Sequence, residues 1–465
     1  MPNRIRVYDR IEDFRHPVAR DHDVVLYSSA WRRLKGVTQV SPVTDGLSRN
    51  HDRLMHSLKV AQVGRRLAEH LIFAKGKELS SLVKPEVIEV AGMVHDLGHP
   101  PFGHVAEKEF QTILGDEHYR WKLAESFEGN AQTFRVVTRL SQKSTSEGGQ
   151  TTHGMNLTFE TLAACTKYPW GYQDAESVLG QEEYSRRSDY YDRKWGYYST
   201  EKPVWDDVWE HVIRGGPFRS ANAALMDLAD DITYAVHDVQ DYLRIGLIPL
   251  HEIGRGLTGQ RNDEFEEFDV YATTALAIDP TIQTENVVEA KKWLADMPYP
   301  TKAFHDSRMD RELLHRWESA AVRTIQGEVF VADGVPQVPE RVTVAIEYLK
   351  ELTWYYVINH PALSASQQGQ RRIIGDLHNW LCDWAAESFA KKGELNAKSK
   401  TSRNLRRLPG RFRDLLNEAP KNASSDERIS RAAVDFISGL TDTEAVSLHH
   451  HLGGNGTNVG LASWL

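Results

Sequence analysis

Histidine is concentrated in one part of this sequence, at spacings that indicate chemistry more than packing. Six of the 20 histidines fall between residues 51 and 104. Three histidines, one aspartate, two glycines and two prolines occur within the ten residues 95–104, HDLGHPPFGH. Glycine and proline disfavour a helix interior, and imidazole with carboxylate is a ligand set that divalent cations accept. The segment therefore predicts a fixed loop that presents imidazoles to a polar ligand.

Four side chains form the candidate metal site. His95 and Asp96 are adjacent, His56 lies on an earlier amphipathic segment, and Asp230 lies on a later one. Two nitrogens and two carboxylates are enough to hold one cation and leave positions for water and substrate oxygens. Each residue alone also fits a structural role, His56 as a buried histidine and Asp230 as a capping or salt-bridged carboxylate. The combination favours the metal site.

The segments around these residues have the periodicity of amphipathic helices. Apolar residues recur at three- and four-residue spacings in five stretches, 54–67, 87–94, 221–243, 342–358 and 371–389. Pro100 and Pro101 are expected to end the second helix. Strand signals are few and short, such as residues 328–331. The sequence therefore predicts an all-α fold with minor short strands.

The composition limits the classes of protein to consider. The chain has 465 residues, of which 26% are charged and 40% hydrophobic, and a net charge of −9. Its two cysteines, Cys165 and Cys382, lie too far apart in sequence for a thiolate metal cluster, and so few cysteines predict a reducing compartment. No apolar run has the length of a membrane span, and the first 20 residues have no leader-like apolar region. We therefore expect a cytoplasmic protein without membrane contact, and the acidic balance argues against a general nucleic-acid coat.

Two stretches depart from this average. Nine aromatic residues lie between Tyr172 and Trp209, which predicts an ordered excursion over residues 171–211 on the helical core. Residues 391–431 contain 12 Lys and Arg against 5 Asp and Glu. Such a stretch fits a solvated helical face or a contact to phosphate or another subunit.

The ordered set of motifs resembles a known family. Residues 53–58, 95–104 and 230–234 resemble the H…HD…D signature of the HD-domain superfamily. More narrowly, the chain resembles the deoxyguanosinetriphosphate triphosphohydrolase family. The further segments that carry this resemblance are 31–34, 38–40, 127–132, 156–158, 167–170 and 437–442.

The resemblance implies an activity and a cofactor. The expected reaction is hydrolysis of deoxynucleoside triphosphates, dGTP or several dNTPs, to deoxynucleoside and tripolyphosphate. A divalent cation, Mn²⁺, Mg²⁺ or similar, would be bound by His56, His95, Asp96 and Asp230. The catalytic candidates are His104 as proton donor, Glu107 as the group that orients it, and His99 facing the same phosphates. If a helix begins at residue 104, His104 and Glu107 share one face of it.

The expected substrate-binding residues come from several segments. Tyr234 and Asp238 follow Asp230 at four-residue spacings, so the three would line one stripe of a helix. The resemblance implies that Tyr234 packs on the deoxyribose, where it excludes a 2′-hydroxyl, and that Asp238 contacts the 3′-hydroxyl. Arg53 shares the helical face of His56 and is expected to bind phosphate. The remaining expected contacts are Gln39 to the sugar, Lys167 and Lys194 to phosphate, and Glu128 and Asn130 without a derived role.

The same resemblance sets the expected organisation and its alternatives. Residues 1–250 would form the HD catalytic core, with the 171–211 excursion, and residues 251–465 a helical C-terminal region packed on it. A homo-oligomer, tetramer or hexamer, is expected, and regulation by an allosteric nucleotide or by single-stranded DNA stays open. One alternative is another HD-type phosphohydrolase, acting on nucleoside monophosphates, a cyclic dinucleotide or an alarmone. Another is a non-catalytic regulator that binds nucleotides or nucleic acid.

Overall fold

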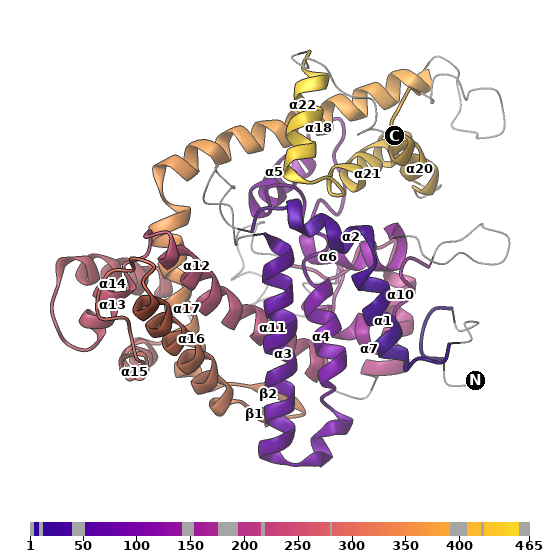
Figure 1. Cartoon of the computed structure of the whole chain (residues 1–465). Helices are drawn as coiled ribbons and strands as arrows, with labels where there is room; N and C mark the ends of the chain where they lie inside the picture. Colours follow the sequence, from indigo (N-terminus) through magenta and orange to yellow (C-terminus); the bar gives the residue numbers. More distant parts are fainter. Residues whose placement is uncertain are drawn as a thin grey trace.

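The computed structural model of the chain shows a helical protein (Figure 1). The residues that it describes are 4–8, 13–39, 52–141, 153–174, 194–214, 219–279, 281–390, 407–419 and 423–454. Within these residues the only strands form a two-stranded antiparallel sheet. The predicted all-α fold with minor strands is therefore confirmed.

The N-terminal half of the chain contributes a bundle of helices. Its α-helices are α1 (Pro17–Leu26), α2 (Ser29–Arg33), α3 (Arg53–Lys75), α4 (Pro85–Val94), α5 (His104–Gly115), α6 (Gly129–Arg135), α7 (Phe159–Ala164), α10 (Lys202–Val208), α11 (Ala221–Ile232) and α12 (Val239–Arg244). Short 3₁₀ and π turns join or extend them: η1 (Leu34–Gly36), η2 (Lys77–Ser81), η3 (Val136–Leu140), η5 (Trp209–Ile213) and η6 (Thr233–Asp238).

The C-terminal half continues the helical pattern. Its elements are α13 (Leu250–Leu257), α14 (Asp263–Leu276), α15 (Thr284–Ala295), α16 (Arg308–Glu328), β1 (Phe330–Ala332), β2 (Val335–Gln337), α17 (Glu340–Thr353), η7 (Trp354–Ile358), α18 (Pro361–Ala390), α20 (Gly410–Glu418), α21 (Ser425–Ile437) and α22 (Asp442–Leu452). Helices α13 to α17 lie on one side of α3 and α11, and the long α18 runs toward α20–α22 on another (Figure 1).

The three helices that carry the predicted metal ligands pack directly on one another. Helix α3 lies beside both α4 and α11 (Figure 1). A small residue makes the α3–α4 approach close, because a Cβ on Gly92 would lie 2.7 Å from the backbone nitrogen of Ala61. Asp52 caps α3 by accepting a hydrogen bond from Met55 N, and Pro85 occupies the first turn of α4. The sequence thus sets where these two helices start and how closely they pack.

The two larger hydrophobic cores among the described residues both draw on distant parts of the sequence. The larger contains buried residues from Val18 to Leu363, and the second joins α5 to α18 and α20–α22. The predicted division at residue 250 stays a prediction, since each core includes residues from both sides of it.

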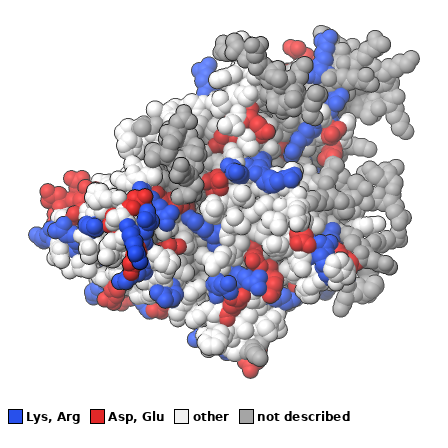
Figure 2. Space-filling view, in the orientation of Figure 1, with Lys and Arg blue, Asp and Glu red and all other residues white. Residues whose placement is uncertain are grey.

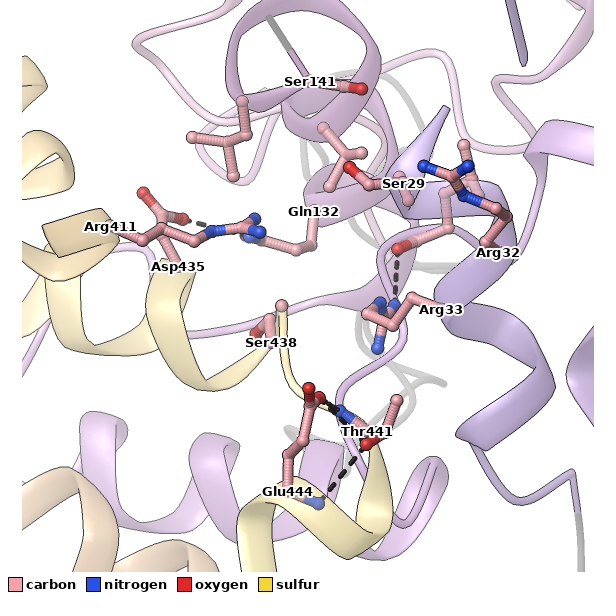
Figure 3. Close-up of a pocket in the computed structure, with 15 residues that line it drawn as sticks. Ser29, Arg32, Arg33, Gln132, Ser141, Arg411, Asp435, Ser438, Thr441 and Glu444 are labelled. Carbon is pink, nitrogen blue, oxygen red and sulfur yellow. Dashed lines mark hydrogen bonds between the residues drawn. The ribbon is translucent and has the colours of Figure 1, made fainter. Parts of the chain in front are cut away.

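A buried charge cluster reinforces the contact between α6 and α21. Asp435 accepts hydrogen bonds from Gln132 Nε2 at 3.0 Å and from Arg135 Nη2 at 2.7 Å, and the Gln132 contact is drawn in Figure 3. Arg135 also donates to Glu201 at 2.7 Å. The side chains of Arg135, Glu201 and Asp435 are at most 2% exposed. The C-terminal helices are thus joined to the N-terminal bundle by ionic as well as apolar contacts.

Some local predictions differ from the structure. The helix expected over 221–243 is interrupted by the π turn η6, which separates α11 from α12. Helix α4 ends at Val94, well before Pro100, because the chain turns at the first residues of the histidine-rich loop. The strand signal at 328–331 overlaps β1.

The described surface carries both signs of charge. Lys and Arg are interspersed with Asp and Glu across the face shown in Figure 2. Among the described residues, none of the helices combines the length and the apolar character needed to cross a membrane. Within the 171–211 excursion, Trp195 and Tyr198 are buried, while residues 175–193 lie outside the described part. Residues 391–406 of the basic stretch lie outside it as well.

Candidate active site

Three side chains from three helices meet at the centre of the candidate site. His56 on α3, His95 at the end of α4 and Asp230 on α11 each offer a ligand atom within 4.8 Å of the others. His56 Nε2 lies 2.8 Å from Asp230 Oδ1, and His95 Nε2 lies 3.4 Å from the same oxygen. Both histidines are buried. The structure therefore brings together three of the four predicted metal ligands around one point.

The orientation of His95 is set by the backbone. Its Nδ1 lies 2.8 Å from the carbonyl oxygen of Gly92, so Nδ1–H donates there and Nε2 is left as the free lone pair. Nε2 is buried and makes no hydrogen bond within the described residues. It faces Asp96 Oδ1 and Asp230 Oδ1, each at 3.4 Å. A buried ring nitrogen that makes no hydrogen bond and lies between two carboxylates is a position that suits a cation.

The charges around His56 favour positive charge at this point. Burial lowers the pKa of His56, but the carboxylates of Asp238 and Asp230 outweigh it and raise the pKa to about 10. Burial likewise opposes ionisation of Asp230, yet Lys167 and His95 hold its pKa well below its usual range. Nitrogen and carboxylate donors without a nearby thiolate fit a divalent cation. The donor atoms of this site therefore fit the expected divalent cation.

Arg53, at the start of α3, contacts Asp96. Its Nη1 donates to Asp96 Oδ2 at 2.6 Å, and its side chain is 1% exposed. The other oxygen, Oδ1, lies 3.1 Å from His99 Nδ1. Burial opposes ionisation of Asp96, but His95, Arg53 and His99 hold its pKa well below the usual range. Arg53, expected to bind phosphate, is placed where it fixes the Asp96 carboxylate.

A second cluster of residues, His99, His104 and Glu107, lies next to Asp96. Helix α5 begins at His104 as expected, and His104 Nδ1 lies 3.0 Å from Glu107 Oε2. His99 Nε2 lies 3.9 Å from the same oxygen, and its ring packs edge-on against His104. The other Glu107 oxygen accepts from Gly129 N at 3.0 Å and faces Lys194 Nζ at 3.4 Å. His104 is 62% exposed and Glu107 is buried, so the His104 ring faces outward while it is anchored to a buried carboxylate.

The pKa shifts separate the two histidines of this group. Burial and the Arg53 guanidinium lower the pKa of His99 to about 4, so His99 is neutral near pH 7. Burial opposes ionisation of Glu107, but Lys194 and His104 hold its pKa well below the usual range. Glu107 is therefore a carboxylate that accepts hydrogen bonds. His99 can offer a neutral ring but not a positive charge.

Glu128 and Asn130 lie at the start of α6 and serve that helix. Glu128 Oε2 accepts from the backbone nitrogens of Asn130 at 2.5 Å and Ala131 at 3.0 Å, and Oε1 accepts from Asn130 Nδ2 at 2.7 Å. Lys194 Nζ lies 3.4 Å from Glu128 Oε1 as well as from Glu107. Burial raises the pKa of Glu128 to about 7, against the opposing effect of Lys194. Both oxygens of Glu128 are thus engaged by its own helix and by Lys194.

Next to Asp230, a lysine and an arginine form ion pairs with aspartates of α11. Lys167 Nζ contacts Asp230 Oδ2 directly and lies 3.2 Å from Asp227 Oδ1. Arg219 Nη2 lies 2.5 Å from Asp227 Oδ2. Burial lowers the pKa of Lys167, but Asp230 and Asp227 raise it well above its usual value. Lys167 is therefore charged and held at the edge of the metal-ligand group.

Tyr234 and Asp238 lie on the π turn η6. Asp238 Oδ1 is 3.6 Å from His56 Nδ1, so the imidazole lies between carboxylates of Asp230 and Asp238. Burial, followed by Asp238, raises the pKa of Tyr234, which keeps its hydroxyl protonated. π turns occur frequently at functional sites. Because a π turn is wider than an α-helical turn, Asp230, Tyr234 and Asp238 do not lie on one regular α-helical stripe.

Gln39 lies beside the start of α3. Its side chain is buried, and its Oε1 makes no hydrogen bond within the described residues. The adjacent Thr38 pairs with Asp52 as an isolated antiparallel bridge. Residues 40–51, including the unassigned His51, lie outside the described part of the chain. A free, buried amide oxygen is consistent with a ligand-contacting role.

Sequence reasoning missed several residues of the site. Asp227 lies three residues before Asp230 on α11, so its shared face was a usable signal. Arg219 carried none, whereas Arg33 lies in the segment 31–34 that resembles the family but was given no role. Arg33 donates to the carbonyl oxygens of Leu97 and His99, both at 2.8 Å, and so holds the histidine-rich loop.

An all-helical fold that joins one His, a His-Asp pair and a distant Asp defines the class of HD-domain phosphohydrolases. The family model described as "HD domain" matches residues 53–164, and the model described as "Phosphohydrolase-associated domain" matches residues 336–451. The first match contains His56, His95 and Asp96. The second contains α17, α18 and α20–α22, of which α17 packs on η6 and α12, and α18 packs on α5.

The relatives narrow this class. A "Deoxyguanosinetriphosphate triphosphohydrolase-like protein 2" of Mesorhizobium japonicum is 35% identical and covers 93% of this chain and 92% of its own. A "Deoxyguanosinetriphosphate triphosphohydrolase-like protein" of Streptomyces coelicolor is 31% identical over 94% of this chain and 92% of its own. One from Bifidobacterium longum is 36% identical over 92% and 81%. The chain belongs to the deoxyguanosinetriphosphate triphosphohydrolase-like family.

Proposed function

We propose that the protein hydrolyses deoxynucleoside triphosphates to deoxynucleoside and tripolyphosphate with a divalent cation, Mn²⁺ or Mg²⁺. One observation carries this proposal: the His56–His95–Asp230 group and the His104–Glu107 pair belong to one continuous set of contacts. Asp96 and His99 link them, with 3.1 Å between Asp96 Oδ1 and His99 Nδ1. A cation site beside a proton donor is what phosphate-ester hydrolysis requires.

The cation would be held by His56, His95, Asp96 and Asp230. A bound divalent cation of this kind lowers the pKa of water and offsets negative charge on phosphoryl oxygens. The residues prepare the site for it: Gly92 fixes the His95 tautomer, and Arg53 fixes Asp96. Mn²⁺ and Mg²⁺ both accept the nitrogen and oxygen donors present.

His104 is the proposed proton donor. In the reaction, water oxygen bonds to the α-phosphorus and releases a proton to the surrounding water, while the bond from phosphorus to the 5′-oxygen breaks and the 5′-oxygen takes a proton. His104 can supply that proton because Glu107 accepts from its Nδ1 and leaves Nε2 facing outward. His99, neutral at pH 7 with a pKa of about 4, is proposed to donate a hydrogen bond to the phosphates without delivering the proton.

The sugar and phosphates are proposed to contact the residues around this centre. Tyr234 and Asp238 would face the deoxyribose from η6, and Gln39 would reach it with its free amide oxygen. A tyrosine at the 2′ position rejects ribonucleotides by a direct clash. Lys167 and Lys194 are proposed to hold the tripolyphosphate, since both are charged and border the catalytic groups.

The regulatory and assembly expectations stay part of this proposal. A homo-oligomer, tetramer or hexamer, and a cytoplasmic location rest on the resemblance and the composition. Regulation by a nucleotide or single-stranded DNA has one supporting feature, a cavity of about 410 Å³ between α2, α21 and the start of α22 (Figure 3). Arg32, Arg33 and Arg411 line it, and guanidinium groups suit phosphate.

A panel of the four dNTPs with Mn²⁺ or Mg²⁺ tests the proposal, with products separated by ion-exchange chromatography. Deoxynucleoside and tripolyphosphate in equal amounts are expected. Orthophosphate or pyrophosphate as the product would instead favour another HD-type phosphohydrolase. If none of the dNTPs is turned over, even in mixtures where one dNTP can activate hydrolysis of another, the non-catalytic regulator is preferred.

A further inference from the structure

The segment 437–442 carries part of the family resemblance but has no role in the proposed reaction. It ends at the first residue of α22. Thr441 and Glu444 form a reciprocal cap there, in which Thr441 Oγ1 accepts from Glu444 N and Glu444 accepts from Thr441 N (Figure 3). The helix start is satisfied by these two residues. The carboxylate of Asp442 is therefore free for other contacts.

Asp442 uses both oxygens to join two segments of the catalytic core. Oδ2 accepts from Thr38 N at 3.0 Å and from Thr38 Oγ1 at 2.5 Å. Oδ1 accepts from Phe102 N at 2.8 Å. Thr38 directly precedes Gln39, and Phe102 lies two residues before His104. One carboxylate thus holds the backbone next to a proposed sugar contact and the turn next to the proposed proton donor.

The turn that Asp442 holds has an unfavourable backbone. Phe102 has φ +66° and Gly103 has φ +59°, and a residue with a side chain, such as Phe102, is strained in this region. The turn is also tightly packed, since a Cβ on Gly103 would lie 2.7 Å from Arg53 Nη2 and 3.2 Å from Thr38 O. The Thr38 segment and the Phe102 turn therefore pack directly against each other. A hydrogen bond from each to one acceptor fixes their relative position.

A second contact docks the same segment on the histidine-rich loop. Arg33 donates to Leu440 O at 3.0 Å while its other amino group donates to Leu97 O and His99 O. Arg33 is labelled beside Thr441 in Figure 3. The segment 437–442 is thereby tied to the loop at both His99 and Phe102.

We propose that Asp442 is a positioning residue, which keeps Gln39 and His104 in register so that both act on one substrate molecule. This proposal rests on the proposed triphosphohydrolase function. The side chain of Asp442 bonds to Thr38 and Phe102 and, among the described residues, to none of the proposed metal ligands, so its loss is expected to alter turnover and sugar selection but not cation binding. The C-terminal region would then be a working part of the catalytic site.

Asp442→Asn tests this role, because an amide keeps the size but cannot accept from both segments. We expect kcat for dNTPs to fall about tenfold or more, and the preference for dGTP over GTP to fall about fivefold. The Mn²⁺ affinity by titration calorimetry is expected to stay within about twofold of wild type. The matched control is Thr443→Ala at the next, exposed position of the same helix end, which should change neither kcat nor the sugar preference.

Amide hydrogen exchange gives a readout that does not depend on the substrate. Faster exchange in Asp442→Asn is expected at residues 37–39 and 101–104 and not in α16. Unchanged exchange there overturns the proposal, as does faster exchange with unchanged kcat and sugar preference. Equal losses in Thr443→Ala also overturn it, since they would reflect the helix end alone. If wild type turns over no dNTP, the proposed function fails, whereas exchange still decides whether Asp442 holds the two segments.

Discussion

Replacing His104 by alanine tests whether this residue is the proposed proton donor or a metal ligand. His104 is 62% exposed and has one hydrogen bond, to Glu107, so its removal should cost under about 1 kcal/mol of folding stability. Loss of a general acid lowers kcat by about 10²- to 10⁴-fold, which is about 3–5 kcal/mol of activation free energy. The expected rise in activation free energy is thus larger than the expected loss of folding stability. Steady-state kinetics measures the first and thermal unfolding measures the second.

The assay combines three measurements on His104→Ala. kcat for the preferred dNTP should fall within that range, Mn²⁺ affinity should be retained, and the melting temperature should change little. A substrate with sulfur in place of the 5′-oxygen should recover most of the rate, because a thiolate leaves without protonation. The exposed His118 provides a matched control, and His118→Ala should behave as wild type.

Three results would refute the reasoning. A kcat within threefold of wild type would show that His104 donates no proton. Lost Mn²⁺ binding would move His104 into the metal site. A rate deficit that is as large with the sulfur-containing substrate would assign His104 to binding instead of proton transfer.

Further predictions concern the metal site and the core. Asp230→Asn should abolish Mn²⁺ binding in calorimetry, and retained affinity would exclude Asp230 as a ligand. Since the raised pKa of His56, about 10, keeps a proton on it below that pH, a cation must displace this proton. Mn²⁺ affinity should therefore fall as pH drops from about 8 to about 6, and a flat profile contradicts this. Arg135→Met removes the ion-pair partner of buried Asp435 and one of the two ion-pair partners of buried Glu201, and should lower the free energy of unfolding by about 3 kcal/mol or more in urea, whereas the same change at Arg139, which is 33% exposed, should cost far less.

The sequence predicted the helices and the metal cluster because both leave local signals. Apolar periodicity marks α3, α4 and α11, and an adjacent His95 and Asp96 in a glycine- and proline-rich loop has no use in a helix core. His56 and Asp230 were chosen on those helices because, together with His95 and Asp96, they resemble the H…HD…D signature. The spacing of His104 and Glu107 at a helix start likewise placed them on one face.

Other features depend on contacts that local patterns do not encode. A π turn differs from an α-helix by one residue per turn, so six residues of apolar periodicity do not distinguish η6 from its flanks. Asp442 contacts Phe102 across 340 positions of sequence, and no charge pattern near either residue indicates it. Lys194 and Arg53 are recognisable as cations, but only the fold shows that each faces a carboxylate.

Hydrolysis in ¹⁸O-labelled water tests the central claim most directly. Attack at the α-phosphorus predicts that one labelled oxygen enters tripolyphosphate and none enters the deoxynucleoside, as read by mass spectrometry of both products. Label in the deoxynucleoside would mean that the carbon–oxygen bond breaks. Label in released orthophosphate would mean attack at the terminal phosphorus, and either result would contradict the proposed triphosphohydrolase.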